Sequence, residues 1–203
     1  IGICDSYNLC GALEFAEKLS KSGTHPLIGT QINFLLEDSI GKLPLFATTS
    51  QGYKNLIKLS SKSYLDSGEK TDSHCEINEL KDSNEGLILF SGNHHGLFGK
   101  LFKKNKLKKI ETAIKELKNI FKDRFYLELQ RHNEDGEENY ENFIIKLSEL
   151  NQIPLMATQE IFYLKKEMYE AHDALVCIGQ KNFVNDPNRL KFSDQHFIKK
   201  NDD

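Results

Sequence analysis

The chain has 203 residues, of which 38% are hydrophobic and 28% are charged. This balance is typical of a globular domain and excludes a disordered chain, and the length predicts one domain over residues 1–203. The net charge of −3 excludes an autonomous DNA-binding domain, because such domains carry a strongly positive surface.

The cysteines and the apolar runs of the chain indicate its cellular compartment. Cys4, Cys10, Cys75 and Cys177 show neither C-x-x-C spacing nor clustering, which favours a reducing compartment over a disulfide framework. No run approaches the ~18 apolar residues of a membrane span, and no signal-peptide pattern opens the chain. We therefore expect a cytoplasmic protein with no membrane partner. Residues 1–5 read as a strand already in progress without an initiator Met, so we expect a preceding segment.

Short apolar runs and helical patterns alternate along the chain. Short apolar runs bounded by Gly, Pro or polar residues predict buried strands at residues 1–4, 26–34, 43–48, 86–90, 125–130 and 153–158. Apolar residues at helical spacing predict helices at residues 11–22, 51–63, 106–121, 138–151 and 167–177. The alternation predicts an α/β fold with largely parallel strand pairing.

Two polar segments interrupt this pattern. Residues 66–84 are rich in Ser, Asp, Glu and Lys and predict a long surface loop. Residues 100–109 contain six lysines. They lack the arginine forks and aromatic platforms of a nucleic-acid site, so a solvated helix start is the favoured interpretation.

Candidate site residues follow from the strand ends, because ligands of α/β proteins gather at the carboxyl edges of the strands. These edges carry two amides, three separate acids and one nearby histidine, which is a weak set for a metal cluster: Asp5, Gln31, Asn93, Glu128, Glu160 and His132. His132 is the best ligand candidate, although a histidine in a polar loop is usually solvated.

Other histidines and motifs offer less. We interpret His94 and His95 as surface residues. We interpret His172 as a buried helix residue whose imidazole is hydrogen-bonded within the protein, rather than as a catalytic group. The chain has no G-x-S-x-G elbow, P-loop or G-x-G-x-x-G motif. The residues alone thus predict an α/β domain with a poor acidic site.

Seven phrases in one order carry a family resemblance. Residues 4–11 (C-D-S-Y-N-L-C-G) and 26–29 (P-L-I-G) resemble the T-D-H-x-N-L-x-G and P-I-x-G phrases of PHP domains at the start of bacterial DNA polymerase III alpha subunits. Further phrases of that family are matched at residues 51–56, 85–92, 126–130, 154–158 and 170–178. The resemblance covers nearly the whole chain and implies a distorted (β/α)7 barrel of the PHP type, here without its first strand.

The resemblance implies a divalent metal site (Zn, Mn or Mg) for phosphoester hydrolysis, but this chain departs from the family's ligands. Ser6 and Lys42 stand where the family has histidine, Gln31 where it has glutamate, and Asn93 where it has cysteine. In the family's late N-D-x-H-Y motif, Glu160 replaces aspartate and Phe162 replaces histidine. Amide, hydroxyl, ammonium and phenyl groups are poor metal ligands. We therefore expect a degenerate site at Asp5 and these six positions, with no bound cofactor.

The resemblance then implies a scaffold that is not itself catalytic. Its expected partners are the remainder of a polymerase alpha chain and the proofreading exonuclease (epsilon) subunit, with DNA contacted only through the whole polymerase. The alternative is an active metal-dependent phosphoesterase or 3′–5′ exonuclease that uses Asp5, Glu128, His132 and Glu160.

Overall fold

A long antiparallel hairpin forms the centre of the sheet. The computed structural model describes residues 1–65 and 72–200. In it, β2 (Leu27–Leu36) pairs with β3 (Ser39–Ala47) over nine residue pairs, from Ile28 opposite Ala47 to Leu36 opposite Ser39. The expectation of largely parallel pairing is wrong here, because the two-residue turn at Glu37 and Asp38 is far too short for the crossover that parallel strands require.

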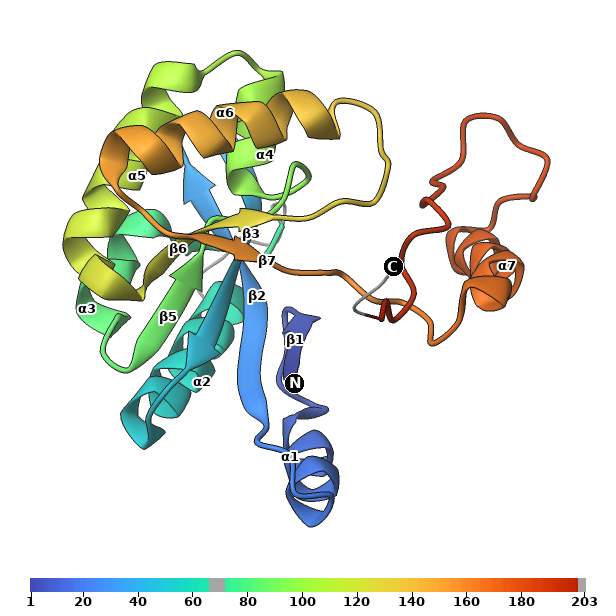
Figure 1. Ribbon diagram of the computed structural model, residues 1–203, viewed down its shortest axis with the longest axis horizontal. Coiled ribbons are helices and arrows are strands. Elements are labelled where there is room, and N and C mark those ends of the chain that lie inside the picture. Colours follow the sequence, from blue (N-terminus) through green and yellow to red (C-terminus); the bar gives the residue numbers. More distant parts are fainter. Residues whose placement is uncertain (66–71, 201–203) are drawn as a thin grey trace. The chain divides into compact units, whose positions relative to one another are not determined.

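The other strands extend this hairpin into one mixed sheet. Within the described residues the strand order is β1-β2-β3-β5-β6-β7, and β4 pairs with β2. The β1–β2 and β5–β6 pairs are parallel, and β3–β5 is antiparallel. The remaining strands are β1 (Gly2–Ser6), β4 (Cys75–Glu76), β5 (Leu87–Phe90), β6 (Phe125–Leu129) and β7 (Leu155–Ala157). The sheet is a curled half-barrel of the expected α/β class, with β1 at one end of the order (Figure 1).

The helices agree with the sequence periodicity at five places. The five expected helices are found as α1 (Ala12–Lys21), α2 (Ser50–Leu65), α5 (Leu107–Phe121), α6 (Glu137–Asn151) and α7 (Tyr169–Gln180). Two helices were missed, α3 (Leu80–Ser83) and α4 (Leu97–Lys103). Short 3-10 turns occupy Ile77–Glu79, Lys122–Arg124 and Lys166–Met168.

The predicted loop over residues 66–84 needs correction. Residues 66–71 lie outside the described residues, whereas β4 and α3 occupy part of the remainder. Cys75 and Leu80 are buried in the main core, so their apolar side chains explain why this polar-looking stretch folds back onto the sheet.

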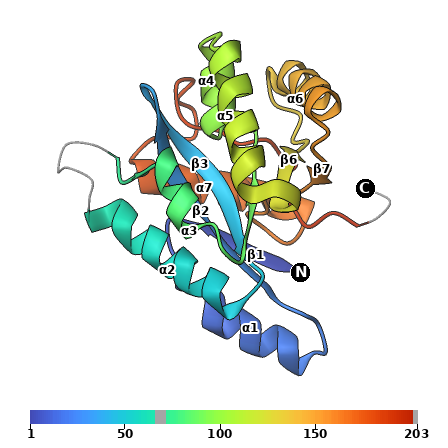
Figure 2. The same cartoon turned by 90° about the vertical axis from the view of Figure 1, so that its left-hand side faces the viewer.

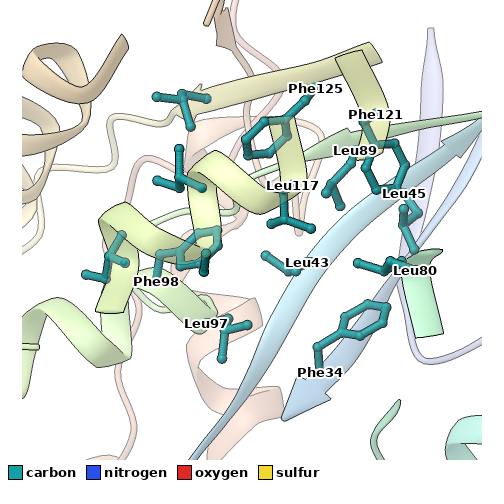
Figure 3. Close-up of a cluster of buried hydrophobic side chains, with 14 of the residues drawn as sticks. Phe34, Leu43, Leu45, Leu80, Leu89, Leu97, Phe98, Leu117, Phe121 and Phe125 are labelled. Carbon is teal, nitrogen blue, oxygen red and sulfur yellow. The ribbon is translucent and has the colours of Figure 1, made fainter. Parts of the chain in front are cut away.

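The core lies between one face of the sheet and the helices. Side chains of the four central strands meet Leu97 and Phe98 of α4 and Leu117 and Phe121 of α5 (Figure 3). In the middle of β2, the buried Ile32 and Phe34 alternate with Gln31 and Asn33, so these two amide side chains lie on the opposite face of the sheet. Figure 2 shows α2 and α5 running along the strands that they cover.

The lysine-rich segment has a structural role that its sequence did not indicate. Lys106 Nζ lies 2.5 Å from Asp38 Oδ1 and Lys109 Nζ lies 2.7 Å from Glu37 Oε1, so both ammonium groups bind the β2–β3 turn. The hydrogen bond from Lys106 lowers the pKa of Asp38 to about 2. Lys104 Nζ adds a 2.8 Å hydrogen bond to Ser39 Oγ. The segment therefore tethers the hairpin rather than only solvating a helix start.

The chain divides into two compact units. Unit 1 comprises residues 1–129 and 140–156, and unit 2 comprises residues 130–139 and 157–203. Within unit 2, Arg189 forms a two-pronged ion pair with Asp173 of α7, with both N–O distances at 2.6 Å. The Gln159 amide donates to the carbonyl oxygens of Gln195 and Phe197. These bonds hold the irregular segments of unit 2 together.

Gly52 gives a test of the packing between α2 and the start of β5. A Cβ on Gly52 would lie 1.9 Å from the carbonyl oxygen of Gly86. Although alanine is a better helix former by about 1 kcal/mol, we expect Gly52→Ala to destabilise the protein by roughly 1–3 kcal/mol through this clash. Urea unfolding measures the change.

Gly179 in α7 is the matched control. A Cβ there meets nothing within 4 Å, so Gly179→Ala should be neutral or stabilising by up to about 1 kcal/mol. Equal effects of the two substitutions would contradict the packing argument.

Candidate functional site

Four polar side chains share the face of the sheet opposite the helices. Ser6 of β1 pairs with Gln31 of β2, and Asn33 of β2 pairs with Lys42 of β3. These residues alternate along their strands with the core residues Ile32 and Leu43, which fixes their direction. We call Ser6, Gln31, Asn33 and Lys42 the polar face. The sheet thus brings together three of the sequence-predicted positions.

Most of the polar face is engaged in internal hydrogen bonds. Lys42 Nζ donates to Ser6 Oγ at 2.9 Å. The Gln31 amide donates to the Cys4 carbonyl at 3.3 Å, and the Asn33 amide donates to the Ser73 carbonyl at 3.1 Å. These groups present N–H donors and one ammonium rather than a set of anionic lone pairs, so the residues do not fit the divalent metal that the resemblance implies.

Asp5 and Asn93 lie apart from the polar face. Asp5 alternates with Ser6, and its Oδ2 lies 3.3 Å from where a Cβ of Gly11 would be, so it points towards the start of α1. The side-chain oxygen of Asn93 accepts the backbone N–H groups of His95 and Gly96 at 3.0 and 3.1 Å. Asn93 therefore shapes the turn into α4, a role typical of asparagine.

Glu128, a weak alternative ligand, is a buried carboxylate of β6. It is 3% exposed, and its backbone N–H donates to Ser91 Oγ at 2.9 Å. Burial, with the charge of Glu128 as a smaller cause, raises the pKa of the neighbouring Tyr140 phenol. Glu128 therefore lies in the interior of unit 1.

Unit 2 contains a column of four aromatic rings. The His132 and His196 rings stack at 4.1 Å with 6° between their planes, and Phe162 stacks on His196 at 4.6 Å. Phe162 also stacks on His172 at 5.2 Å with 9° between the planes. We call these four residues the ring column. It joins three chain segments that are far apart in sequence.

Burial disfavours the charged form of two imidazoles in the ring column, those of His132 and His172. Burial, followed by the neighbouring His196, lowers the pKa of His132 to about 4, and burial lowers the pKa of His172. His196 Nδ1 lies 3.1 Å from the Glu160 carbonyl oxygen, an arrangement that suits a proton on Nδ1. His196 Nε2 then faces Glu134 Oε1 at 3.5 Å.

This geometry does not suit one shared metal ion. The lone pairs of ring nitrogens lie in the ring plane. Because the ring planes of His132 and His196 are nearly parallel and stacked, their lone pairs do not converge on one point where an ion could bind both. Phe162 fills the space between His196 and His172 with carbon. Glu160 contributes its backbone oxygen to His196, which holds the column rather than an ion.

Sequence reasoning missed several of these residues. His94 was expected to lie at the surface, and His132, the best ligand candidate, had a solvated loop residue as its alternative interpretation, but they are 3% and 2% exposed. His196 had no expected partner. Its stacking partners His132 and Phe162 and its hydrogen-bond partner Glu160 lie at least 34 positions away, so no local signal marks these contacts. Asn33 escaped notice because it lies inside a strand rather than at its end.

Comparison with known proteins identifies relatives along the whole chain. The PHP domain family matches residues 1–132. The chain is 36% identical to the DNA polymerase III subunit alpha of Rickettsia bellii and 34% identical to that of Caulobacter vibrioides, covering 98% of this chain in each case. It spans only 17% and 18% of the lengths of these relatives.

One solved structure is also similar. It is a candidate metal-dependent phosphoesterase from Bifidobacterium adolescentis, with a TM-score of 0.48 and 12% identity over 78% of this chain and 75% of that chain. Among the described residues, no helix is long and apolar enough to cross a membrane.

The lowered pKa of His132 predicts a pH-dependent stability. Folded His132 takes up a proton only near pH 4, whereas the unfolded histidine does so near 6.5. Its contribution to stability is therefore complete above pH 6.5 and is lost as the pH falls from 6.5 towards 4. Urea unfolding between pH 7.5 and pH 5 should show this loss.

The replacement His132→Phe keeps a ring in the column but removes the titrating group, so the pH dependence should become shallower. His25→Phe changes an exposed histidine and should leave it unaltered. Identical pH profiles for the wild type and His132→Phe would contradict the assignment.

Proposed function

Because this chain belongs to the PHP domain family, we propose that it is the PHP region of a DNA polymerase III alpha subunit and serves there as a scaffold without catalysis of its own. The match to alpha subunits over 98% of the chain is the observation that carries this proposal. Nucleotidyl transfer for DNA replication would then belong to the much longer remainder of such a polymerase, in the cytoplasm.

The chemistry of the polar face supports the absence of catalysis. Hydrolysis of a phosphoester by a metal needs an ion that polarises the phosphoryl group and lowers the pKa of a bound water. Such an ion needs converging anionic or imidazole ligands. Lys42, Gln31 and Ser6 offer an ammonium, an amide and a hydroxyl that bond within the protein.

A protein-binding role is supported by the surface of unit 2. Leu175 and Ile178 of α7 are 64% and 74% exposed, and Phe183 beyond it is 85% exposed. Apolar side chains gathered on one short segment favour contact with another protein surface. In this proposal the partners are the rest of the alpha chain and the proofreading exonuclease subunit. DNA is reached only through the assembled polymerase, which agrees with the net charge of −3.

The first test is hydrolysis. Purified chain incubated with Mn²⁺, Zn²⁺ or Mg²⁺ should show no turnover of a phosphomonoester or of a DNA 3′ end, and Glu160→Ala should leave this unchanged. The alternative function, a metal-dependent phosphoesterase, is supported instead if turnover is found and is lost both on chelation and in Glu160→Ala. Glu138→Ala, at an exposed position of α6, is the control.

The second test is partner binding. The alpha chain should form a stable complex with the proofreading exonuclease subunit of the same organism, measured by calorimetry and light scattering. A scaffold without a metal site should bind equally well in the presence of a chelator. Failure to bind, or binding only with added metal, would contradict the scaffold proposal.

A further inference from the structure

Lys42 occupies a prepared position on the polar face. Its Nζ lies 2.9 Å from Ser6 Oγ and 5.4 Å from the centroid of the Tyr7 ring, a distance at which an ammonium interacts with an aromatic face. The residue is half-buried, so these two contacts replace part of its hydration. Both partners come from the end of β1, two strands away from Lys42.

The backbone holds Tyr7 in place for this contact. Tyr7 has a φ of 69°, which lies in the left-handed region that residues other than glycine seldom adopt. Its N–H donates to the Gln31 carbonyl at 2.8 Å, and its carbonyl accepts the Tyr64 hydroxyl at 3.2 Å. Because hydrogen bonds hold both its N–H and its carbonyl, Tyr7 keeps this unusual backbone conformation through its surroundings.

The residues around Lys42 surround its ammonium group as they would surround a bound cation. The hydroxyl of Ser6 and the ring of Tyr7 face the ammonium, while Asn33 hydrogen-bonds the Tyr7 hydroxyl. Gln31 lies on the strand between Ser6 and Lys42, and its amide is turned to the Cys4 carbonyl. A divalent ion at the polar face would meet a fixed like charge in place of a ligand.

We infer that the Lys42 ammonium is the resident cation of the polar face and that its presence, more than the lack of ligands at Ser6 and Gln31, excludes a divalent metal ion there. This inference rests on the proposed function, in which the chain has no metal chemistry, and it names the residue responsible. It assigns Lys42 a positioning role for Ser6 and Tyr7 at the end of β1.

The experiment restores ligands with and without Lys42. Ser6→His/Gln31→Glu keeps Lys42, and Ser6→His/Gln31→Glu/Lys42→Met removes its charge without adding a further ligand, so both variants place the same imidazole and carboxylate on adjacent strands. Imidazole and carboxylate are ligands that Zn²⁺ accepts. Thermal unfolding of each 203-residue variant is measured with ZnCl₂ and with EDTA.

The expected result is a saturable rise in Tm with Zn²⁺ for the triple variant alone. The wild type and Ser6→His/Gln31→Glu should unfold at the same temperature with Zn²⁺ as with EDTA. An equal rise in the double and triple variants, or no rise in the triple variant, would overturn the inference. A metal-dependent rise in the wild type would also overturn it.

A second measurement tests the stabilising contacts even if the multiple variants fold poorly. Lys42→Met keeps the alkyl stem but removes the charge, and we expect Tm to fall by roughly 3–6 °C from the lost charged hydrogen bond. Lys58→Met, at an exposed position of α2, is the matched control and should leave Tm unchanged. Equal Tm values for wild type and Lys42→Met would contradict the role of the ammonium.

These outcomes separate the two proposals. Metal-dependent hydrolysis by the wild type refutes the proposed function. An inert wild type together with Zn²⁺ binding by Ser6→His/Gln31→Glu refutes only the role of Lys42.

Discussion

The alternation of the β2–β3 hairpin is the constraint on which unit 1 depends. Phe34, Leu43 and their apolar neighbours are buried beneath the helices on one face, so Gln31, Asn33 and Lys42 must lie on the other. A shift of one residue in register would exchange the two sets and expose the core. Core packing therefore fixes the polar face together with the helices. Lys106, just before α5, and Lys109, within it, add to this by binding the β2–β3 turn.

On this scaffold the side chains decide the chemistry. A sheet of this kind holds polar groups in a fixed array, and their type determines whether the array attracts a cation or satisfies itself. Here the hydroxyl of Ser6 accepts a hydrogen bond from Lys42, and the amides of Gln31 and Asn33 donate to backbone carbonyls. The polar face is thus satisfied by hydrogen bonds within the protein.

Unit 2 uses histidine in a different way from a metal site. The imidazoles of His172 and His196 serve as flat rings that pack on Phe162, and that of His132 packs on His196. Burial disfavours the charged forms of His132 and His172. The backbone carbonyl of His196 accepts a hydrogen bond from the N–H of Phe162, in the segment that follows β7. The number of histidines in a sequence therefore says little about metal binding until their ring planes are known.

The sequence alone determined the α/β class, the five long helices and the positions of all the described strands except β4, because apolar periodicity reflects burial on one side of each element. It also determined that Ser6, Gln31 and Lys42 are poor metal ligands, since that is a property of the side chains. Tertiary structure decided which of these residues meet. The Lys42–Ser6 bond spans two strand pairings, and the His132–His196 stack joins segments 64 residues apart, so neither leaves a local pattern for a sequence to reveal.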